Sequence, residues 1–400
     1  MTRTDVEFDP FSQEFFDDPY EIYARLRDER PVYHNERLGF WALSRFDDVV
    51  HAHRDWQTFS SNFGVTLEQL QSGAPDLTGS IIMIDPPEHE RLRKLVSRAF
   101  TPRAVAAMEP LIRGVQAKFL DALMARDSFD IVGDFAALFP CEVISTILGV
   151  PEPERQAIRL RADLMLHREP GNPNSTDEGL QAGVENGVYF YQLAREKRAH
   201  PDEHMISLLC EVEVEEPDGS RHRLDDAEIA NFATLIALAG SETVTKLVAN
   251  AVVEFSRHPD EWQRILDGSV APTNAVEEIL RYQPPSQYQG RFSVKEAEFE
   301  GGTIPAGQPV LLITGAATRD PRAYDDPDRF DVGRAPLLAV GLGHGIHACL
   351  GAALARLESR IAIEEIARRW PRYDVDEAGL ERVHMSNVAG WSKVPFAPRV

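Results

Sequence analysis

Apolar residues recur three and four positions apart over most of the segment from about 85 to 259, with polar residues between them. This is the period of amphipathic helices, so the pattern predicts one helix after another. The longest begins at Asp225, which can cap it together with Glu228, and ends before Pro259. Because residues 229–240 are apolar nearly all round, we expect this helix to run through the core.

Two other segments have the alternating pattern of strands. Residues 32–46 alternate around a turn near Gly39, and between residues 287 and 312 the period falls towards two. A stretch at 169–179 rich in proline and glycine indicates a flexible connection between helices. We therefore predict a mainly α fold with a minor β portion, about 31–46 and 287–312, in a single domain over residues 1–400.

Composition and charge narrow the choice of function. With 43% hydrophobic and 26% charged residues, the 400 positions are typical of a globular enzyme with a sizeable core. The formal net charge of −22 argues against nucleic acid or an anionic membrane as a partner, since both bind basic surfaces. No apolar run has the length of a membrane span, and the first residues lack a signal-peptide core, so we expect a cytoplasmic protein.

Three scattered cysteines do not predict a disulfide framework. Cys141 and Cys210 lie in apolar helical stretches and are expected to be buried thiols. Cys349 is different, because it lies one residue before a predicted helix over 350–370, whose N-terminal dipole favours a thiolate. The loop before it has three glycines that can take positive φ and bring N–H groups towards the sulfur: Gly341, Gly343 and Gly345.

Taken alone, this loop leaves three roles open for Cys349. It can be a metal-bound thiolate, a zinc ligand together with His344 and His347, or a bystander in a glycine-rich helix cap. The zinc reading lacks a fourth ligand nearby. The residues themselves do not choose between the other two.

The order from Gly343 to Gly351, GHGIHACLG, resembles the haem-binding loop of bacterial cytochrome P450 enzymes of the soluble, class I type. Leu342 stands where that family usually has phenylalanine. The resemblance implies the cytochrome P450 fold, a helical haem domain with a small β-sheet region. It also implies that Cys349 is the axial ligand of the iron in haem b.

The resemblance gives a shared role to four separated basic residues. His89 and Arg93 lie four apart on a predicted helix, a pattern that by itself is common on exposed surfaces. With Arg291 and His347, they match the family positions that bind the haem propionates, where charge-assisted hydrogen bonds are strong. A buried dianion needs such partners.

The segment Ala239 to Thr243, AGSET, interrupts the apolar helix. One account is a packing glycine, Gly240, with Glu242 paired to Lys246 one turn later. The segment also resembles the family's oxygen-activation motif. In that reading Ala239 and Gly240 make room for dioxygen, while Glu242 and Thr243 deliver protons to it.

Glu278 and Arg281 lie three apart on a predicted helix, which alone is a weak signal for an ion pair. In the family the same spacing forms a buried pair that braces the haem-side core, and a later arginine, here Arg334, completes the network. Thr318 replaces the asparagine of the family's neighbouring segment.

The function implied is that of a haem-thiolate monooxygenase. It would insert one atom of dioxygen into a small or medium, mainly apolar organic substrate, by hydroxylation or oxidative dealkylation. Electrons would come ultimately from NAD(P)H through a ferredoxin reductase and a ferredoxin. Two alternatives stay open: a peroxide-driven oxygenase of the same fold and a haem-binding sensor or carrier without turnover.

Two further groups of residues follow from the resemblance. The substrate is expected to contact five residues: Leu235, Ala239, Gln287, Tyr288 and Val388. A local basic patch is expected to dock an acidic ferredoxin: Arg91, Lys94, Arg98, Arg356 and Arg360.

Overall fold

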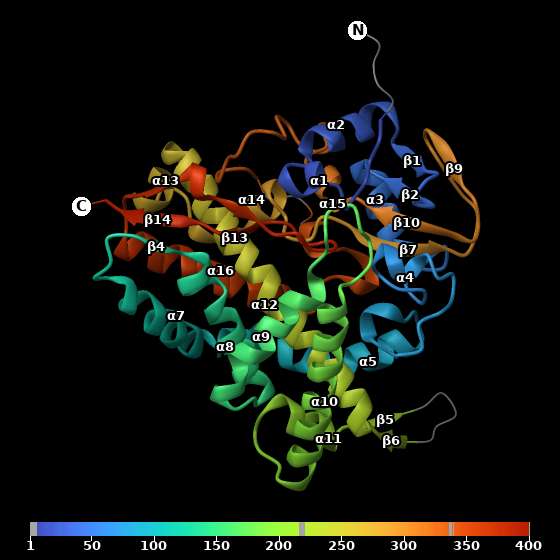
Figure 1. The fold of residues 1–400 in the computed structure, drawn as a ribbon, viewed down its shortest axis with the longest axis horizontal. Helices are drawn as coiled ribbons and strands as arrows, with labels where there is room; N and C mark the ends of the chain where they lie inside the picture. Colours follow the sequence, from blue (N-terminus) through green and yellow to red (C-terminus); the bar gives the residue numbers. More distant parts are fainter. Residues whose placement is uncertain (1–5, 216–220, 336–337, 339, 400) are drawn as a thin grey trace.

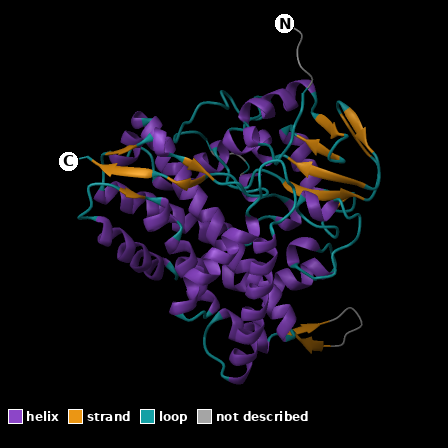
Figure 2. Cartoon of the chain, in the orientation of Figure 1, coloured by secondary structure: helices purple, strands orange, loops and turns teal. Residues whose placement is uncertain are grey.

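The computed structural model describes residues 6–215, 221–335, 338 and 340–399. Helices fill the centre of the molecule, and strands lie towards its margins (Figure 2). The α-helices are α1 (Gln13–Asp17), α2 (Tyr20–Glu29), α3 (Phe46–Arg54), α4 (Leu67–Leu70), α5 (Glu88–Ser97), α6 (Pro102–Ala106), α7 (Glu109–Leu123), α8 (Leu138–Leu148), α9 (Glu152–Leu166), α10 (Asp177–Ala199), α11 (Met205–Glu211), α12 (Asp226–Arg257), α13 (Pro259–Leu266), α14 (Pro272–Tyr282), α15 (Thr314–Ala317) and α16 (Ala352–Arg369). The mainly α class predicted from the periodicity is confirmed.

The long helix α12 crosses the middle of the molecule (Figure 1). Its predicted capping box is confirmed: the Asp225 carboxylate accepts from the N–H groups of Ala227 and Glu228, both at 2.8 Å, and the Glu228 side chain accepts from the Asp225 N–H. The helix packs against α8, α9, α10, α14 and α16. Both of the largest core clusters therefore contain residues of α12.

Among the described residues, α12 is the single helix with the length and hydropathy of a membrane span. The pair formed by residues 132–148 and 152–166 reaches that length only if it is counted as one span with a bend of 118°. Of the apolar window in α12, 56% is buried inside the protein. Contacts within the protein therefore account for most of its apolar surface.

The strands are β1 (Val32–Asn35), β2 (Phe40–Leu43), β3 (Phe59–Ser60), β4 (Phe129–Asp130), β5 (Glu213–Glu215), β6 (Arg221–Arg223), β7 (Gln289–Ser293), β8 (Ala297–Phe299), β9 (Gly302–Ile304), β10 (Gln308–Leu312), β11 (Tyr373–Val375), β12 (Glu381–Arg382), β13 (Trp391–Lys393) and β14 (Pro395–Pro398). The main sheet has the order β1-β2-β10-β7-β3, and β10 is parallel to β2 while the other pairs are antiparallel. Val310 of β10 lies opposite Arg291 of β7, so this arginine sits on an inner strand.

The main sheet comes largely from the two segments predicted to be β. The sequence pattern did not predict a second sheet, in which β14 lies between β11 and β4. It also missed the small β5–β6 and β12–β13 pairs. These strands are two to four residues long, which is too short for an alternating pattern to be seen.

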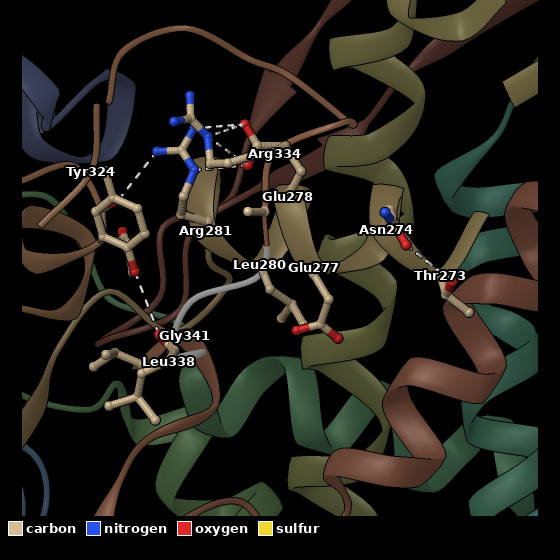
Figure 3. Close-up of a pocket in the computed structure, with 13 residues that line it drawn as sticks. Thr273, Asn274, Glu277, Glu278, Leu280, Arg281, Tyr324, Arg334, Leu338 and Gly341 are labelled. Carbon is tan, nitrogen blue, oxygen red and sulfur yellow. Dashed lines mark hydrogen bonds and ion pairs between the residues drawn. The ribbon is translucent and has the colours of Figure 1, made fainter. Parts of the chain in front are cut away.

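A buried ion-pair network holds α14 to the segment that leads to the cysteine loop. Glu278 Oε1 lies 2.7 Å from Arg281 Nη2, and Glu278 Oε2 lies 3.4 Å from Arg334 Nε. Figure 3 shows both arginines close to Glu278 beside a hollow of about 170 Å³. Arg281 also donates to the backbone carbonyls of Thr318, Pro327 and Arg329. Since the contact to Thr318 uses its carbonyl, the identity of that side chain does not alter this hydrogen bond.

This network predicts unequal effects for two neighbouring glutamates. Glu278→Gln should lower the free energy of unfolding by about 3–5 kcal/mol, because it leaves a buried arginine without its carboxylate. Glu277→Gln is the matched control, since Glu277 pairs with Arg356 where both side chains are about a third exposed, and it should cost less than about 1 kcal/mol. Urea titration measures both values, and equal losses would contradict the network's importance.

Candidate functional site

The loop that carries Cys349 has a tightly fixed backbone. It contains two short 3₁₀ turns, Val340–Leu342 and Gly345–His347. Gly343 and Gly345 have φ of 72° and 69°, a region that favours glycine. A Cβ at position 345 would also collide with the carbonyl oxygen of His53. The N–H of Cys349 donates to the Leu342 carbonyl at 2.8 Å, which closes the loop just before α16 begins at Ala352.

The environment of the Cys349 thiol differs from the expectation. The residue is open to a cavity, and the N–H of Gly351 and the positive charge of Arg93 favour its thiolate. Burial outweighs them and raises the pKa of Cys349 above its usual value. The helix N-terminus therefore does not by itself produce a free thiolate, and the anion needs a further positive partner such as a metal ion.

Three basic side chains line one edge of this cavity, and a fourth, Arg291, is buried close to the two histidines among them. His89 and Arg93 come from α5, Arg291 from β7, and His347 from the loop. The rings of His89 and His347 have centroids 4.3 Å apart. Neither nitrogen of His89, nor Nε2 of His347, has a hydrogen-bond partner in the described part of the chain. Arg93 Nη2 donates to the Ala348 carbonyl at 2.5 Å. The sequence segments that carry these residues are far apart, and folding brings them together.

Burial disfavours the charged forms of this group. Burial and the neighbouring arginines lower the pKa of His89 to about 4 and that of His347 to about 2. Burial lowers the pKa of Arg291 to about 10, and Asp85 only partly offsets this effect. A dianionic ligand at this edge would supply the missing negative charge and hydrogen-bond acceptors.

The wall opposite the cysteine is formed by α12. Ala239, Gly240 and Thr243 line the cavity together with Cys349. Thr243 Oγ1 donates to the Ala239 carbonyl at 2.8 Å, a bond within the helix. A Cβ on Gly240 would lie 3.0 Å from Ile144 of α8, so Gly240 is also a packing glycine. The two accounts of this residue from the sequence are thus compatible.

The space between the cysteine and α12 consists of two adjoining cavities of about 180 and 220 Å³. They share six lining residues: Ala239, Thr243, Val244, His347, Cys349 and Ala355. The walls are mostly apolar and surround the cysteine and the threonine from both sides.

Glu242 lies on the other side of α12 from this space. Its side chain is buried, and its Oε2 lies 3.0 Å from Lys246 Nζ. It lines a separate chamber of about 410 Å³ between α9, α12 and the C-terminal β12–β13 hairpin. Of the predicted acid–alcohol pair, only Thr243 faces the cysteine cavity.

The predicted substrate contacts divide into two groups. Leu235 and Ala239 line the cavity. The other three are not among the residues that line the two cavities. Tyr288 is fully buried in the core, and its hydroxyl donates to the Ser386 carbonyl at 2.6 Å. Gln287 accepts from the Tyr23 hydroxyl, and Val388 packs in a small cluster with Val383 and Met385.

Sequence reasoning missed several cavity residues. Ile81, Ile82, Phe100 and Ile144 add apolar wall, and only Ile81 and Ile82 had a local signal, an apolar pair shortly before His89. His53 was also missed. It is buried behind the loop, burial and Arg291 lower its pKa to about 3, and neither ring nitrogen has a partner among the described residues.

The zinc hypothesis is not supported by the geometry. The described part of the chain contains no group of three or more histidine, cysteine, aspartate or glutamate side chains placed to hold a metal ion. His344 Nε2 accepts from Arg54 Nε at 2.7 Å instead of joining Cys349. The donor set fits haem: one thiol, an edge of two arginines and two histidines, and small residues on the opposite wall.

Comparisons with known proteins agree with this donor set. The family model for cytochrome P450 matches residues 273–372. A putative cytochrome P450 123 of Mycobacterium bovis is 39% identical over 395 residues, 98% of this chain and 97% of the relative. The erythromycin C-12 hydroxylase of Saccharopolyspora erythraea is 40% identical over 358 residues, 88% of this chain and 87% of that enzyme. The solved structure of CYP109E1 from Bacillus megaterium in complex with testosterone has a TM-score of 0.88 and 30% identity, and it covers 97% of this chain and 100% of that chain.

The cationic edge predicts opposite effects of one substitution on two states of the protein. Arg291→Leu should speed haem transfer to apomyoglobin about tenfold or more, the effect of losing a hydrogen bond to a charged group worth about 1.5–3 kcal/mol. The same change should stabilise the haem-free chain, because it removes a buried cation. Arg372→Leu, at an exposed position, is the control and should change neither value. An unaltered haem-transfer rate in Arg291→Leu would contradict this role.

Proposed function

The chain belongs to the cytochrome P450 family, and we propose that residues 1–400 act as one domain that hydroxylates a bulky, mainly apolar molecule with electrons from a ferredoxin. Its activity is that of a monooxygenase, as in the named hydroxylases to which it is similar. Its cofactor is haem. When bound, the haem supplies the reductive activation of dioxygen and the transfer of one oxygen atom to the substrate.

The observation that supports this proposal best is the placement of Cys349. Its thiol lies across an apolar space from the small residues Ala239 and Gly240 of α12, and basic side chains lie along one edge of that space. In the proposal Cys349 binds the iron as a thiolate, and the loop glycines Gly343 and Gly351 leave the backbone close to the cofactor. His89, Arg93, Arg291 and His347 hold its propionates by charge-assisted hydrogen bonds.

The residues on α12 are proposed to leave space for dioxygen and to supply protons to it. In the proposal Ala239 and Gly240 leave the space for dioxygen next to Thr243. The Thr243 hydroxyl already donates within the helix, so its oxygen can accept a hydrogen bond at the cavity face. Glu242 is the acid that supplies Thr243, and Lys246 holds it ionised between transfers because its positive charge lowers the pKa of Glu242.

The substrate class is proposed from the cavity and the relatives. The wall is apolar at Ile81, Ile82, Phe100, Ile144 and Leu235. Relatives include enzymes named erythromycin C-12 hydroxylase and vitamin D(3) 25-hydroxylase, and a structural neighbour was solved with testosterone. A large ring-bearing molecule such as a macrolide or a steroid fits this lining. The cations at the edge serve the cofactor, so substrate recognition rests mainly on apolar contact.

The electrons are proposed to come from NAD(P)H through a ferredoxin reductase and a ferredoxin in the cytoplasm. Among the basic residues expected to dock it, Lys94 is exposed, whereas Arg356 pairs with Glu277 and Arg360 pairs with Glu109 and Glu364. The Arg98 side chain lies outside the part that the structure describes. Lys94 therefore offers the most accessible charge to an acidic partner.

The absorption spectrum of the reduced protein with carbon monoxide tests the central role of Cys349. The expected result is a strongly red-shifted Soret band that Cys349→Ala abolishes, since only a thiolate ligand produces it. Cys210→Ala, at a buried cysteine far along the chain, is the control and should keep the band. A Soret band in the usual position in the unmodified protein would reject thiolate ligation and favour the sensor or carrier.

Charge reversal at Lys94 tests the docking surface. Lys94→Glu should slow reduction of the protein by ferredoxin about tenfold at low salt, and the difference should shrink as salt screens the charges. Lys295→Glu reverses an exposed lysine on the turn after β7 and should have little effect. Stopped-flow absorbance measures both rates. Equal slowing by the two variants would mean that net charge, and not this surface, governs reduction.

A further inference from the structure

The chamber behind α12 is a space that the proposed function leaves without a role. Its volume is about 410 Å³, and it lies between α9, α12, the helical turn Val132–Ala136 and the C-terminal β12–β13 hairpin. In Figure 1, α9 and β13 lie beside the middle of α12, and α9 contacts α12 directly. The chamber is separate from the cysteine cavity.

Charged and titratable side chains face this chamber from each of its main walls. They are Arg159, Asp163 and His167 from α9, Glu242 and Lys246 from α12, and Arg382 and His384 from the hairpin segment. Arg159 Nη1 lies 2.9 Å from Asp163 Oδ2, and Lys246 Nζ lies 3.0 Å from Glu242 Oε2. Arg382 stacks on the ring of Trp391, with its guanidinium carbon 3.7 Å from the ring centroid. Each of the two acids therefore has its own cation.

The two acids also interact with each other. Both side chains line the chamber, and each carboxyl group alters the pKa of the other. Two ionised carboxylates that share a buried site repel each other, so a proton on one of them is favoured. Burial and the charge of Glu242 raise the pKa of Asp163, while Lys246 lowers that of Glu242. Asp163 is consequently the member of the pair that carries the proton.

The two acids differ in their access to water. The Asp163 side chain is 33% exposed, whereas that of Glu242 is 2% exposed. Asp163 is therefore accessible to solvent in the chamber, whereas the Glu242 side chain is buried against α12. Thr243, the next residue, faces the opposite space. The order from water inwards is Asp163, Glu242, Thr243.

We propose that Asp163 is a positioning residue for catalysis, which takes protons from the chamber and passes them to Glu242. The inference rests on the proposed function, since protons are consumed only if oxygen is reduced. In each transfer the proton moves from the Asp163 carboxyl to a carboxylate oxygen of Glu242, and the Asp163 carboxylate takes a new proton from water. Glu242 is thereby reprotonated as the acid proposed above for Thr243, its neighbour along α12. No electrons are exchanged in these steps.

Infrared difference spectra of the resting ferric protein test the shared proton without turnover. At neutral pH we expect carbonyl bands of protonated carboxylic acids that shift in heavy water. Burial also raises the pKa of Glu358, so one band belongs to that residue. A second band should be lost in Asp163→Asn and kept in Glu154→Gln, the matched control at an exposed acid on the same helix. If Asp163→Asn removes no band of the unmodified protein, the proposal is wrong.

Steady-state turnover with a hydroxylated substrate tests the transfer itself. Asp163→Asn should lower kcat at least about tenfold, the low end for loss of a proton-transfer group, and should divert more of the reducing equivalents to hydrogen peroxide. KM and the substrate-induced spin shift should not change. In the unmodified protein kcat should fall as the pH rises through the pKa of the pair, because Asp163 loses its proton, and Asp163→Asn should lose this dependence.

Asp163→Glu, which keeps an acid, should recover most of the turnover and the pH dependence. Equal values of kcat and of peroxide yield in Asp163→Asn and Glu154→Gln would overturn the proposal. Failure of the proposed function looks different: the unmodified protein would show the Asp163 carbonyl band but no hydroxylation with any electron donor. That result would reject the relay along with the monooxygenase.

Discussion

The buried passage of α12 through the molecule is the constraint on which the rest of the structure depends. A helix that packs against several neighbours must match each of them, and its residues occur in both of the largest core clusters. One face contributes Ala239 and Thr243 to the cysteine cavity, and another contributes Glu242 and Lys246 to the chamber. The helix therefore separates two environments of different polarity. Moving it would disturb both at once.

Patterns that act over one or two helical turns were visible in the sequence. The capping box at Asp225 and Glu228 was found, because both partners lie within one turn. The Glu278–Arg281 pair is another local pattern, and the structure brings Arg334 to it from a distant segment. The role of Cys349 as a haem ligand followed from the resemblance of its loop to that of a family. The spacing of the loop glycines alone left a simple helix cap open as well.

The sequence did not predict side-chain directions and pKa shifts that depend on residues far away along the chain. Alternation from residue 287 to 312 predicts a strand, but it does not say which face meets the cavity. The Tyr288 side chain lies in the core, where its ring packs against Phe15 and its hydroxyl donates to the Ser386 carbonyl. The pKa of Cys349 has the same origin: the helix terminus is a local feature, while the burial that outweighs it depends on the whole fold.

The buried basic groups near Cys349 have a consequence for how the protein is made. Without an anionic cofactor, burial lowers the pKa of Arg291, His89 and His347 and disfavours their charged forms. The empty chain is therefore less stable than its core alone would allow. A ligand that binds only the folded state adds its binding free energy to stability. Chain synthesis and haem supply are therefore coupled, and newly made chains in a haem-starved cell would be the ones exposed to proteolysis.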